Sequence, residues 1–576
     1  MAIAVSCCRR CGPLSEPLSN LRRAEPLTHA EFQRQMASWI MDPSQQGRLR
    51  KRMDLFDCGV LVVLAVVSVW PMIVLNARQG PNAIWNGTDG ILVSDQMNYL
   101  GWIQVAAKHV LISDPFTTAR SAADYLHPGL AISGLLVRLG MTPTMAYLVW
   151  EPVAVVVLFV GLRRYVRASL VGIWPRRLAL VLSLFYISPA GALVAWLNGP
   201  HWSNFFLLQP IDVEMWPVGG LWGYPFTAIA IGAMVLCLLA YERDRRSLRI
   251  RPAAPLLALL CAWLQPWQGA TLIAMVVVTE LTLRLRGDRV RLALPAMMLS
   301  AIAAPLVYYS VLSHLDSTWQ LAGRVNLTIF PAFPWEPILI SIAPLALLSA
   351  LAYWLPIAGF HDLALRVWPI SALTLYGIIG FVHIGTFPLH SLQGIGIPLA
   401  VLGVMGARKL HFPVRNRSRI AIASVVVALL VIPSGLSELH SVWGLGSSPT
   451  LFGPQPVFVT ADEREALNYL REDRAPGAVL TPYYLGQTIP AETGRHTWLG
   501  SFSWTPDFFK RITVANDLFS GRLSPSSVNR VVRSSTARFL LSDCNQHADL
   551  SSVLRPILGS VRHFGCATVY QLRPGE

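Results

Sequence analysis

The sequence predicts an α-helical polytopic membrane protein of about eleven transmembrane helices with a C-terminal extracytoplasmic α/β domain. The chain is 53% hydrophobic and only 14% charged, whereas about a quarter of the residues in soluble domains are charged. Apolar segments of membrane-spanning length recur from residue 58 to residue 435. After residue 436 the pattern changes to that of a water-soluble unit with alternating helices and strands.

The first 57 residues are polar and rich in arginine, without a long apolar run ahead of a cleavage site. We therefore expect a basic, partly disordered cytoplasmic tail rather than a signal peptide. Its Cys7, Cys8 and Cys11 have no matching second half of a zinc site in the sequence, which favours reduced, unpaired thiols. The net charge of +15 is concentrated in short loops between apolar segments, so it indicates topology and does not indicate nucleic-acid binding.

The module from residue 58 to 436 contains the predicted spans. The first span leaves the cytoplasm, and residues 76–142 form the first external loop. An odd number of spans with the tail inside places the domain of residues 437–576 outside. The short segments on either side of Gln265 form a hairpin that need not cross the membrane fully. The predicted spans are 58–75, 143–162, 178–197, 221–241, 253–266, 269–283, 291–312, 335–355, 367–386, 393–407 and 419–435.

The C-terminal unit carries the signals of an α/β domain. Residues 461–470 have helical spacing, whereas 478–481 and 537–542 are typical of strands. Cys544 and Cys566 both lie in this unit, which is predicted to face an oxidising compartment. A disulfide between them is therefore expected.

The stretch Thr88–Leu111 is the first candidate for a functional segment. We expect Ser94 to cap a helix whose first turn contains Asp95, where the helix dipole favours a negative charge. Asp95, Tyr99 and Trp102 fall one turn apart and share one side, which suits the floor of a sugar site. The alternative is a capped surface helix with a solvated Asp95. An apolar face at helical spacing predicts that this helix lies along the membrane; it consists of Leu100, Ile103, Ala107 and Leu111.

Further candidates gather in the predicted external loops. The loop 198–224 is aromatic and carries His201, Asp212 and Glu214. The hairpin tip adds Trp267 and Gln268, and His127 follows the first candidate helix. Aromatic rings stack on sugar faces, and amides and carboxylates bind hydroxyls. The alternatives are aromatic-belt anchoring for the tryptophans and structural hydrogen bonds for the histidines.

Three stretches resemble the GT-C glycosyltransferases, membrane enzymes that transfer a sugar from a polyprenyl-phosphate carrier. The likeness is to bacterial and actinobacterial members related to the protein mannosyltransferase and arabinofuranosyltransferase groups, and with the topology it covers most of the chain beyond residue 57. The stretches are SDQMNYLGWIQVA at 94–106, LQPWQGATL at 264–272 and IPAETGRHTWLGSFSWTPDFFKR at 489–511.

The resemblance implies that Asp95 acts as the general base or binds the acceptor. The family often has a second acid two residues away, but position 93 is Val in this chain. A tightly held Mg²⁺ or Mn²⁺ would need two carboxylates besides phosphate oxygens, so the sequence leaves the metal open. Asp89 or Glu214 could supply a second carboxylate oxygen only through folding.

We therefore predict a glycosyltransferase of the bacterial inner membrane, with a glycan, lipid or protein as acceptor. Asp95 is the predicted base, and the predicted sugar or acceptor contacts are Asp89, Tyr99, Trp102, His127, Trp267 and Gln268. Basic residues are scarce in the external loops, so Arg324 is the first choice as a ligand of the donor phosphate, followed by His383 and His390. The segment Gly494, Arg495, His496 and Trp498 is expected to gate or bind the acceptor, with a structural ion pair as the alternative for Arg495.

Two other function classes fit the sequence. A lipid or polysaccharide flippase needs internal repeats and ionisable residues within its spans; the predicted spans have Glu151 and Glu280 near their ends. A catalytically silent scaffold of the same fold fits the missing acidic partner of Asp95.

Overall fold

A computed structural model describes residues 53–196, 211, 214–329, 334–382, 387–410, 416–447, 451–453, 455–546 and 548–574. The chain divides into two compact units, residues 1–58 and 59–576. Cys7, Cys8, Cys11, His201, Asp212 and His383 lie outside the described residues.

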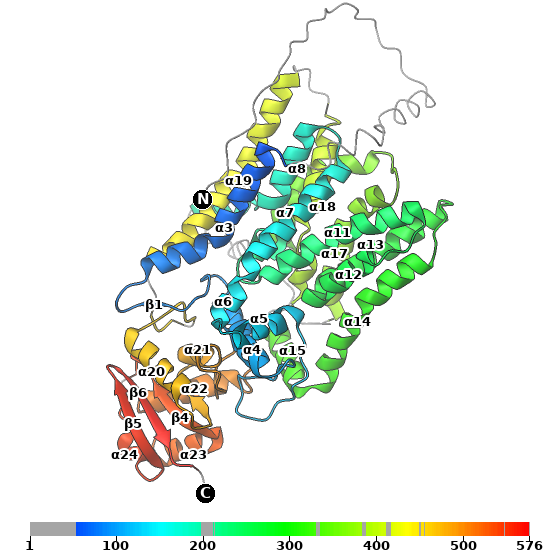
Figure 1. Cartoon of the computed structure of the whole chain (residues 1–576). Helices are drawn as coiled ribbons and strands as arrows, with labels where there is room; N and C mark the ends of the chain where they lie inside the picture. Colours follow the sequence, from blue (N-terminus) through cyan, green and yellow to red (C-terminus); the bar gives the residue numbers. More distant parts are fainter. Residues whose placement is uncertain are drawn as a thin grey trace, which may run out of the picture. The chain divides into compact units, whose positions relative to one another are not determined.

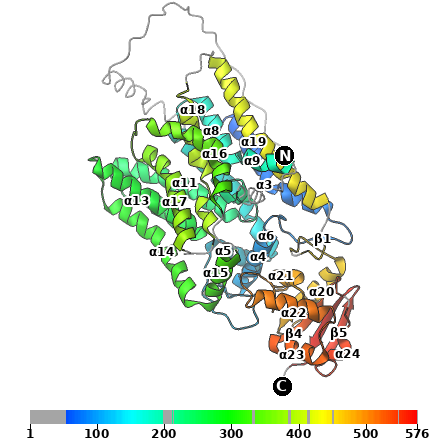
Figure 2. The same ribbon diagram turned by 180° about the vertical axis from the view of Figure 1, so that it is seen from behind.

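The protein is a multi-pass membrane protein. Figures 1 and 2 show the arrangement of its helices from opposite sides. Nine helical segments of the described chain are long and apolar enough to cross a membrane. They are α3 (Leu55–Arg78), α6 (Pro143–Leu148) with α7 (Trp150–Ser169), α11 (Pro225–Ser247), α13 (Pro266–Leu285), α14 (Ala293–Leu315), α16 (Trp335–Ala350) with η3 (Leu351–Trp354), α17 (Phe360–Val382), η4 (Pro388–Leu392) with α18 (Gly396–Ala407), and α19 (Asn416–Ser447).

The expected number of eleven spans is therefore corrected to nine candidates. The segment 253–266 forms α12 (Ala253–Leu264), whose 12 residues span only about 18 Å. It ends because Gln265 precedes Pro266 and is extended, with φ −145° and ψ 95°. The segment 178–197 is divided into α8 (Ile173–Phe185) and α9 (Pro189–Trp196), with an extended Tyr186 between them.

The first candidate helix is α4 (Val93–Lys108), and it packs against α5 (Pro128–Arg138) and α21 (Tyr483–Thr493), as Figure 1 shows. Ser94 is not its cap. The cap is Leu92, without a side-chain hydrogen bond, and Ser94 Oγ donates to Gln487 Oε1 at 2.6 Å. Asp95 lies in the first turn, as predicted.

The predicted membrane-facing side of α4 is also corrected. Leu111 lies beyond the end of the helix and is exposed, whereas Gln96 and Asn98 are buried together with Leu100 and Ile103. Polar and apolar sides are thus both covered by protein. Tertiary packing, rather than a lipid surface, holds α4 in place.

The C-terminal region is a four-stranded mixed sheet in the order β3-β4-β6-β5, with helices on both faces. β3 (Ala478–Leu480) is parallel to β4 (Ala537–Ser542), and β6 (Ala567–Leu572) is antiparallel to both β4 and β5 (Leu558–Phe564). The predicted helix 461–470 and strands 478–481 and 537–542 are confirmed by α20 (Ala461–Glu472), β3 and β4. The hairpin of β5 and β6 was not predicted.

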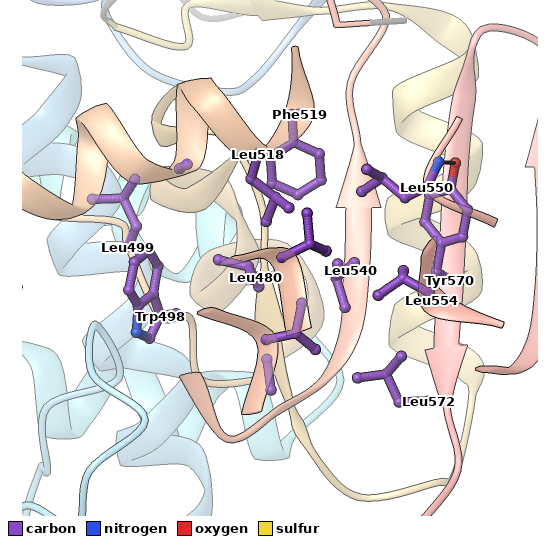
Figure 3. Packing of buried hydrophobic residues seen from close by; sticks show 14 of the residues in the cluster. Leu480, Trp498, Leu499, Leu518, Phe519, Leu540, Leu550, Leu554, Tyr570 and Leu572 are labelled. Carbon is purple, nitrogen blue, oxygen red and sulfur yellow. Dashed lines mark hydrogen bonds between the residues drawn. The ribbon is translucent and has the colours of Figure 1, made fainter. Parts of the chain in front are cut away.

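Alternate residues of β4 supply two separate cores, because side chains of a strand point to opposite faces. Phe539 and Leu541 pack on the side of α20 and α21. Leu540 packs with Leu480, Phe519 and neighbouring side chains on the opposite side (Figure 3). The helices of this second side are α22 (Phe508–Phe519), α23 (Pro525–Ser535) and α24 (Ser551–Leu554).

The helix of the last predicted span, α19, continues to Ser447. The first strand after it, β2 (Phe458–Val459), pairs antiparallel with β1 (Ile84–Trp85), which follows α3. The two remaining elements are η2 (Gly219–Leu221) and α15 (Ser317–Ile329).

A disulfide joins Cys544, after β4, to Cys566, in the turn between β5 and β6. It closes a sequence separation of 22 residues. Replacing both cysteines by serine is expected to lower the free energy of unfolding by about 3 kcal/mol, because the open chain gains entropy when unfolded. Thermal unfolding of the purified protein measures the effect. Cys58→Ser, which removes an exposed free thiol, is the control and should leave Tm unchanged; an equally stable double variant would contradict the prediction.

Candidate active site

The centre of the candidate site is the carboxylate of Asp95. It is half-buried in the first turn of α4. Within the described part of the chain, no side chain forms a hydrogen bond or ion pair with it. Burial raises the pKa of Asp95 to about 6; the negative charge of Glu214 also raises this pKa, whereas His390 lowers it. A carboxylate in this state is available to accept a proton near neutral pH.

The side chains of Glu214 and His390 lie next to each other and face Asp95. His390 Nε2 lies 3.6 Å from Glu214 Oε2, and Gln393 Nε2 donates to the same oxygen at 2.8 Å. Burial opposes ionisation of Glu214, but His390 and the hydrogen bond from Gln393 lower the pKa of Glu214 below its ordinary value. The site therefore contains one carboxylate that stays ionised and another, Asp95, that titrates near pH 6.

Two glutamines of the α12–α13 hairpin hold this pair in place. Gln265 Nε2 donates to Gln393 Oε1 at 2.9 Å and to Thr227 Oγ1 at 3.2 Å. Gln268 Nε2 donates to the backbone oxygens of Gln393 at 3.0 Å and His390 at 3.3 Å. The extended Gln265 before Pro266 ends α12, and Gln268 lies in the first turn of α13.

Aromatic rings form the wall beside Asp95. The ring of Tyr99 lies 4.9 Å from Tyr224, 5.9 Å from Trp102 and 6.0 Å from Tyr147, measured between centroids. Burial raises the pKa of Tyr99, and the charge of Asp95 raises this pKa further, which agrees with the predicted shared side of α4. The rings of Tyr99 and Tyr224 are partly exposed, whereas those of Trp102 and Tyr147 are buried.

His127 holds Tyr224 of this wall in place. Its Nδ1 accepts from the backbone N–H of Leu130 at 3.3 Å, and its Nε2 lies 3.0 Å from the Tyr224 hydroxyl, which donates to the Leu264 carbonyl. Burial lowers the pKa of His127 to about 4, so the ring is neutral and donates from Nε2. Both ring nitrogens are thus engaged in positioning Tyr224 and α5.

Asp89 has a different environment from Asp95. It is buried, and its carboxylate accepts hydrogen bonds from the backbone N–H groups of Ile91, Leu92 and Gly223. Burial raises the pKa of Asp89 despite these bonds. The geometry assigns Asp89 to holding the loop before α4.

The other predicted residues are distributed as follows. The ring of Trp267 lies 6.4 Å from that of His390, and Arg324 lies exposed on α15. Among the described residues, Arg495 forms no ion pair and instead donates to the backbone oxygens of Leu470, Asp473, Ala475 and Gly477. His496 Nδ1 lies 2.9 Å from the Thr117 carbonyl oxygen, and the Trp498 ring is covered by Arg511.

The geometry around Asp95 does not fit an ion held by three protein ligands. Among the described residues, the ligand atoms of Asp462, Cys544 and Cys566 form the one group of three that could share an ion, and its cysteines are in the disulfide. The ligand atoms of Asp95, Glu214 and His390 are not that close together. We derive no step through a metal.

Sequence reasoning missed several residues of this site. The local sequence around Gln393 and Tyr147 does not mark them as site residues, because they lie in or next to predicted spans. Their place in the site depends on neighbours that are distant in the chain. Tyr224 ends the aromatic loop and Gln265 begins the hairpin tip, two segments that the sequence had already marked. Their positions beside a proline, Pro225 and Pro266, were the available signal.

No protein-family model and no curated protein sequence matches this chain. In structure, the chain is similar to ArnT of Cupriavidus metallidurans with undecaprenyl phosphate bound, with 13% identity, coverage of 89% of this chain and 98% of that one, and a TM-score of 0.46. It is also similar to the oligosaccharyltransferase of Archaeoglobus fulgidus in its apo form, with 12% identity and a TM-score of 0.44. This match covers 86% of the present chain and 71% of the archaeal one. A second structure of that archaeal enzyme, in complex with an inhibitory peptide and a dolichol-phosphate, is similar with 12% identity and a TM-score of 0.41. This match covers 88% of the present chain and 73% of the archaeal one.

Proposed function

We propose that this protein is a membrane glycosyltransferase that moves a sugar from a polyprenyl-phosphate carrier to an acceptor hydroxyl. One observation carries the proposal. The Asp95 carboxylate is half-buried beside an aromatic wall, and it forms no hydrogen bond or ion pair with the described residues. An acceptor hydroxyl is a weak nucleophile, so a base must take its proton as the new bond forms. Asp95 is that base.

The leaving group is a phosphate and gains stability from a nearby cation. His390, which faces Asp95 and is oriented by Glu214, is our first choice. Arg324 and His383 remain proposed further ligands of the donor phosphate. Tyr99, Trp102 and Trp267 would stack on the sugar or the acceptor.

The three stretches that resemble GT-C enzymes meet around α4, which supports the assignment. Asp95 belongs to the first stretch, and Gln268 of the second donates to the backbone of His390. The third stretch covers α4, since Gln104 Nε2 donates to the Ala491 carbonyl at 3.1 Å and Lys108 Nζ to the Gly494 carbonyl at 2.9 Å. We extend the proposal to a bacterial inner membrane with the C-terminal region outside the cytoplasm.

Sugar transfer by the purified protein in lipid nanodiscs tests the proposal. The donors are a panel of radiolabelled polyprenyl-phosphate sugars, and the acceptors are cell-envelope glycan, lipid and protein fractions. Transfer from at least one donor, proportional to the amount of enzyme, is expected. Absence of transfer from every donor would overturn the proposal in favour of a flippase or a silent scaffold.

The rate of transfer should depend on pH through Asp95. Its pKa is raised from 3.8 to about 6, so the base is deprotonated above pH 6 and protonated below. We expect kcat/KM to be constant above pH 7 and to fall roughly tenfold per pH unit below pH 6. Initial rates from pH 4.5 to pH 8, with thermal unfolding at each pH as the control for stability, check this. A flat profile with an intact fold would contradict it.

A further inference from the structure

A cavity of about 520 Å³ lies between the end of α4 and the C-terminal region. Its volume falls in the range of about 300 to 1,000 Å³ in which proteins bind small organic ligands. Lys108 and Thr118 line it from the first part of the chain, and the loop after α20 and the segment after α21 line it from the C-terminal region. Folding therefore assembles this cavity from separate parts of the chain.

Cationic side chains outnumber acidic ones in the lining. Among the described residues that line the cavity, one lysine and three arginines accompany a single acid, Asp473. Burial lowers the pKa of Lys108, and the positive charge of Arg495 lowers this pKa further. An anion inside the cavity would offset this repulsion between like charges. The cationic residues are Lys108, Arg471, Arg474 and Arg495.

Asp473 is engaged in holding its own loop. Its Oδ2 accepts from the Tyr469 hydroxyl at 2.8 Å, and its Oδ1 accepts from the backbone N–H of Ala475 at 2.7 Å. One carboxylate offsets one of the four positive charges at most. The lining therefore keeps a positive net charge.

Hydrogen bonds cross-link the two sides of the cavity. His496 Nδ1 lies 2.9 Å from the Thr117 carbonyl oxygen, which only accepts, so Nδ1 is the donor. The backbone N–H of Thr497 donates to the Pro115 carbonyl at 3.0 Å, and that of Val479 donates to the His496 carbonyl at 2.9 Å. A site that is already formed binds its ligand at a smaller entropic cost.

The cations of the lining differ in the donors that they have left. The guanidinium of Arg495 uses its N–H groups on the backbone of the loop after α20, so it shapes the cavity. Lys108 gives Gly494 one of its three N–H groups. In the described chain the exposed Arg474 side chain forms no hydrogen bond or ion pair. Lys108 and Arg474 therefore have donors to offer a ligand.

The chemistry of the lining indicates the class of ligand. Lysine and arginine donors suit phosphate, which has several strong acceptor oxygens. The cavity is more than ten times the volume of a water molecule, about 30 Å³, so a free phosphate ion would leave most of it empty. Its described lining contains no large apolar side chain, which disfavours an acyl chain. The remainder of the ligand is therefore polar.

We propose that this cavity binds a phosphorylated polar ligand of about the size of a sugar, with Lys108 and Arg474 as the partners of the phosphate. The site is separate from the candidate active site. Lys108 follows Asp95 by thirteen residues on α4, a rise of about 20 Å. The inference therefore does not depend on the proposed sugar transfer.

Binding to the full-length protein in detergent, measured by isothermal titration calorimetry at pH 7.5, tests the cavity. The probes are glucose 6-phosphate, glucose and inorganic phosphate, in 0.15 M NaCl, which screens charges beyond about 8 Å. We expect glucose 6-phosphate to bind at least about tenfold more tightly than either other probe, equivalent to about 1.4 kcal/mol. Equal affinity for glucose would overturn the phosphate site, and equal affinity for inorganic phosphate would overturn the sugar-sized ligand.

A double variant, Lys108→Gln with Arg474→Gln, assigns the phosphate partners. Both positions keep a side-chain amide that donates hydrogen bonds, and Tm checks the fold. We expect glucose 6-phosphate to bind at least about tenfold more weakly. Arg555→Gln is the matched control, because it removes an exposed arginine just before β5, at the opposite edge of the sheet from β3. Unchanged affinity in a folded double variant would overturn the assignment.

The binding and transfer assays separate the two proposals. Asp95→Asn should bind glucose 6-phosphate as tightly as the unaltered protein. Binding that persists in a protein without transfer from any donor would sustain the cavity and overturn the enzyme. Transfer by a protein that does not prefer glucose 6-phosphate to glucose would sustain the enzyme and overturn the cavity.

Discussion

An Asp95→Asn variant should lose about three orders of magnitude in the rate of sugar transfer and still fold normally. The substitution keeps the shape of the side chain and removes the proton acceptor, and general-base catalysis typically contributes 10²- to 10⁴-fold. Asp95 makes no hydrogen bond with the described residues, so the substitution should change the free energy of unfolding only slightly. The measurement is kcat at saturating donor and acceptor, together with Tm.

Asp89→Asn is the matched control for this experiment. Asp89 lies in the loop before the same helix, but its carboxylate is engaged by backbone N–H groups, and asparagine retains an acceptor for them. We expect transfer within a few-fold of the unaltered enzyme. If Asp95→Asn transfers normally while Asp89→Asn does not, the base has been assigned to the wrong aspartate.

The second large effect is expected at the Glu214–His390 pair. His390→Gln should lower transfer about a hundredfold, because it removes the side chain proposed to stabilise the phosphate leaving group and takes one of two neighbours from the partly buried Glu214. His390 also lowers the pKa of Asp95. The acidic limb of the pH profile should therefore move to higher pH.

Glu214→Gln should shift the pKa of Asp95 in the opposite direction. The charge of Glu214 raises the pKa of Asp95, so its removal should move the acidic limb to lower pH. Initial rates of both variants from pH 4.5 to pH 8 give the two shifts. A purely structural role of the pair would lower the rate in both variants without moving the limb in opposite directions.

The class of the protein and much of the C-terminal region could be predicted from local patterns. Hydropathy over a span-length window and helical or alternating spacing are properties of neighbouring residues, so α20, β3 and β4 were found at nearly their observed bounds. The excess of two spans arose because composition does not show where a helix is interrupted. Pro266 gives the physical reason for one interruption, since proline disfavours helical backbone in the residue before it, and Gln265 is extended. The other interruption begins at Tyr186, which is also extended.

Part of the candidate site could likewise be predicted from local patterns, and part could not. Asp95, Tyr99 and Trp102 could be chosen from one helix, because their relation depends on helical geometry alone. The wrong cap at Ser94 shows the limit of this reasoning, since Gln487, a partner far away in the chain, takes the Ser94 hydroxyl.

Local patterns along the chain were enough to recognise a helical membrane protein and to select an acid in the first loop. Long-range packing alone shows that Glu214, His390 and the glutamine network face Asp95, and that hydrogen bonds hold His127 and Asp89 in place. It alone brought Lys108 of α4 to the same cavity as the arginines of the C-terminal region. The physical reason is that burial, charge interaction and hydrogen-bond satisfaction depend on neighbours in space, which no local pattern contains.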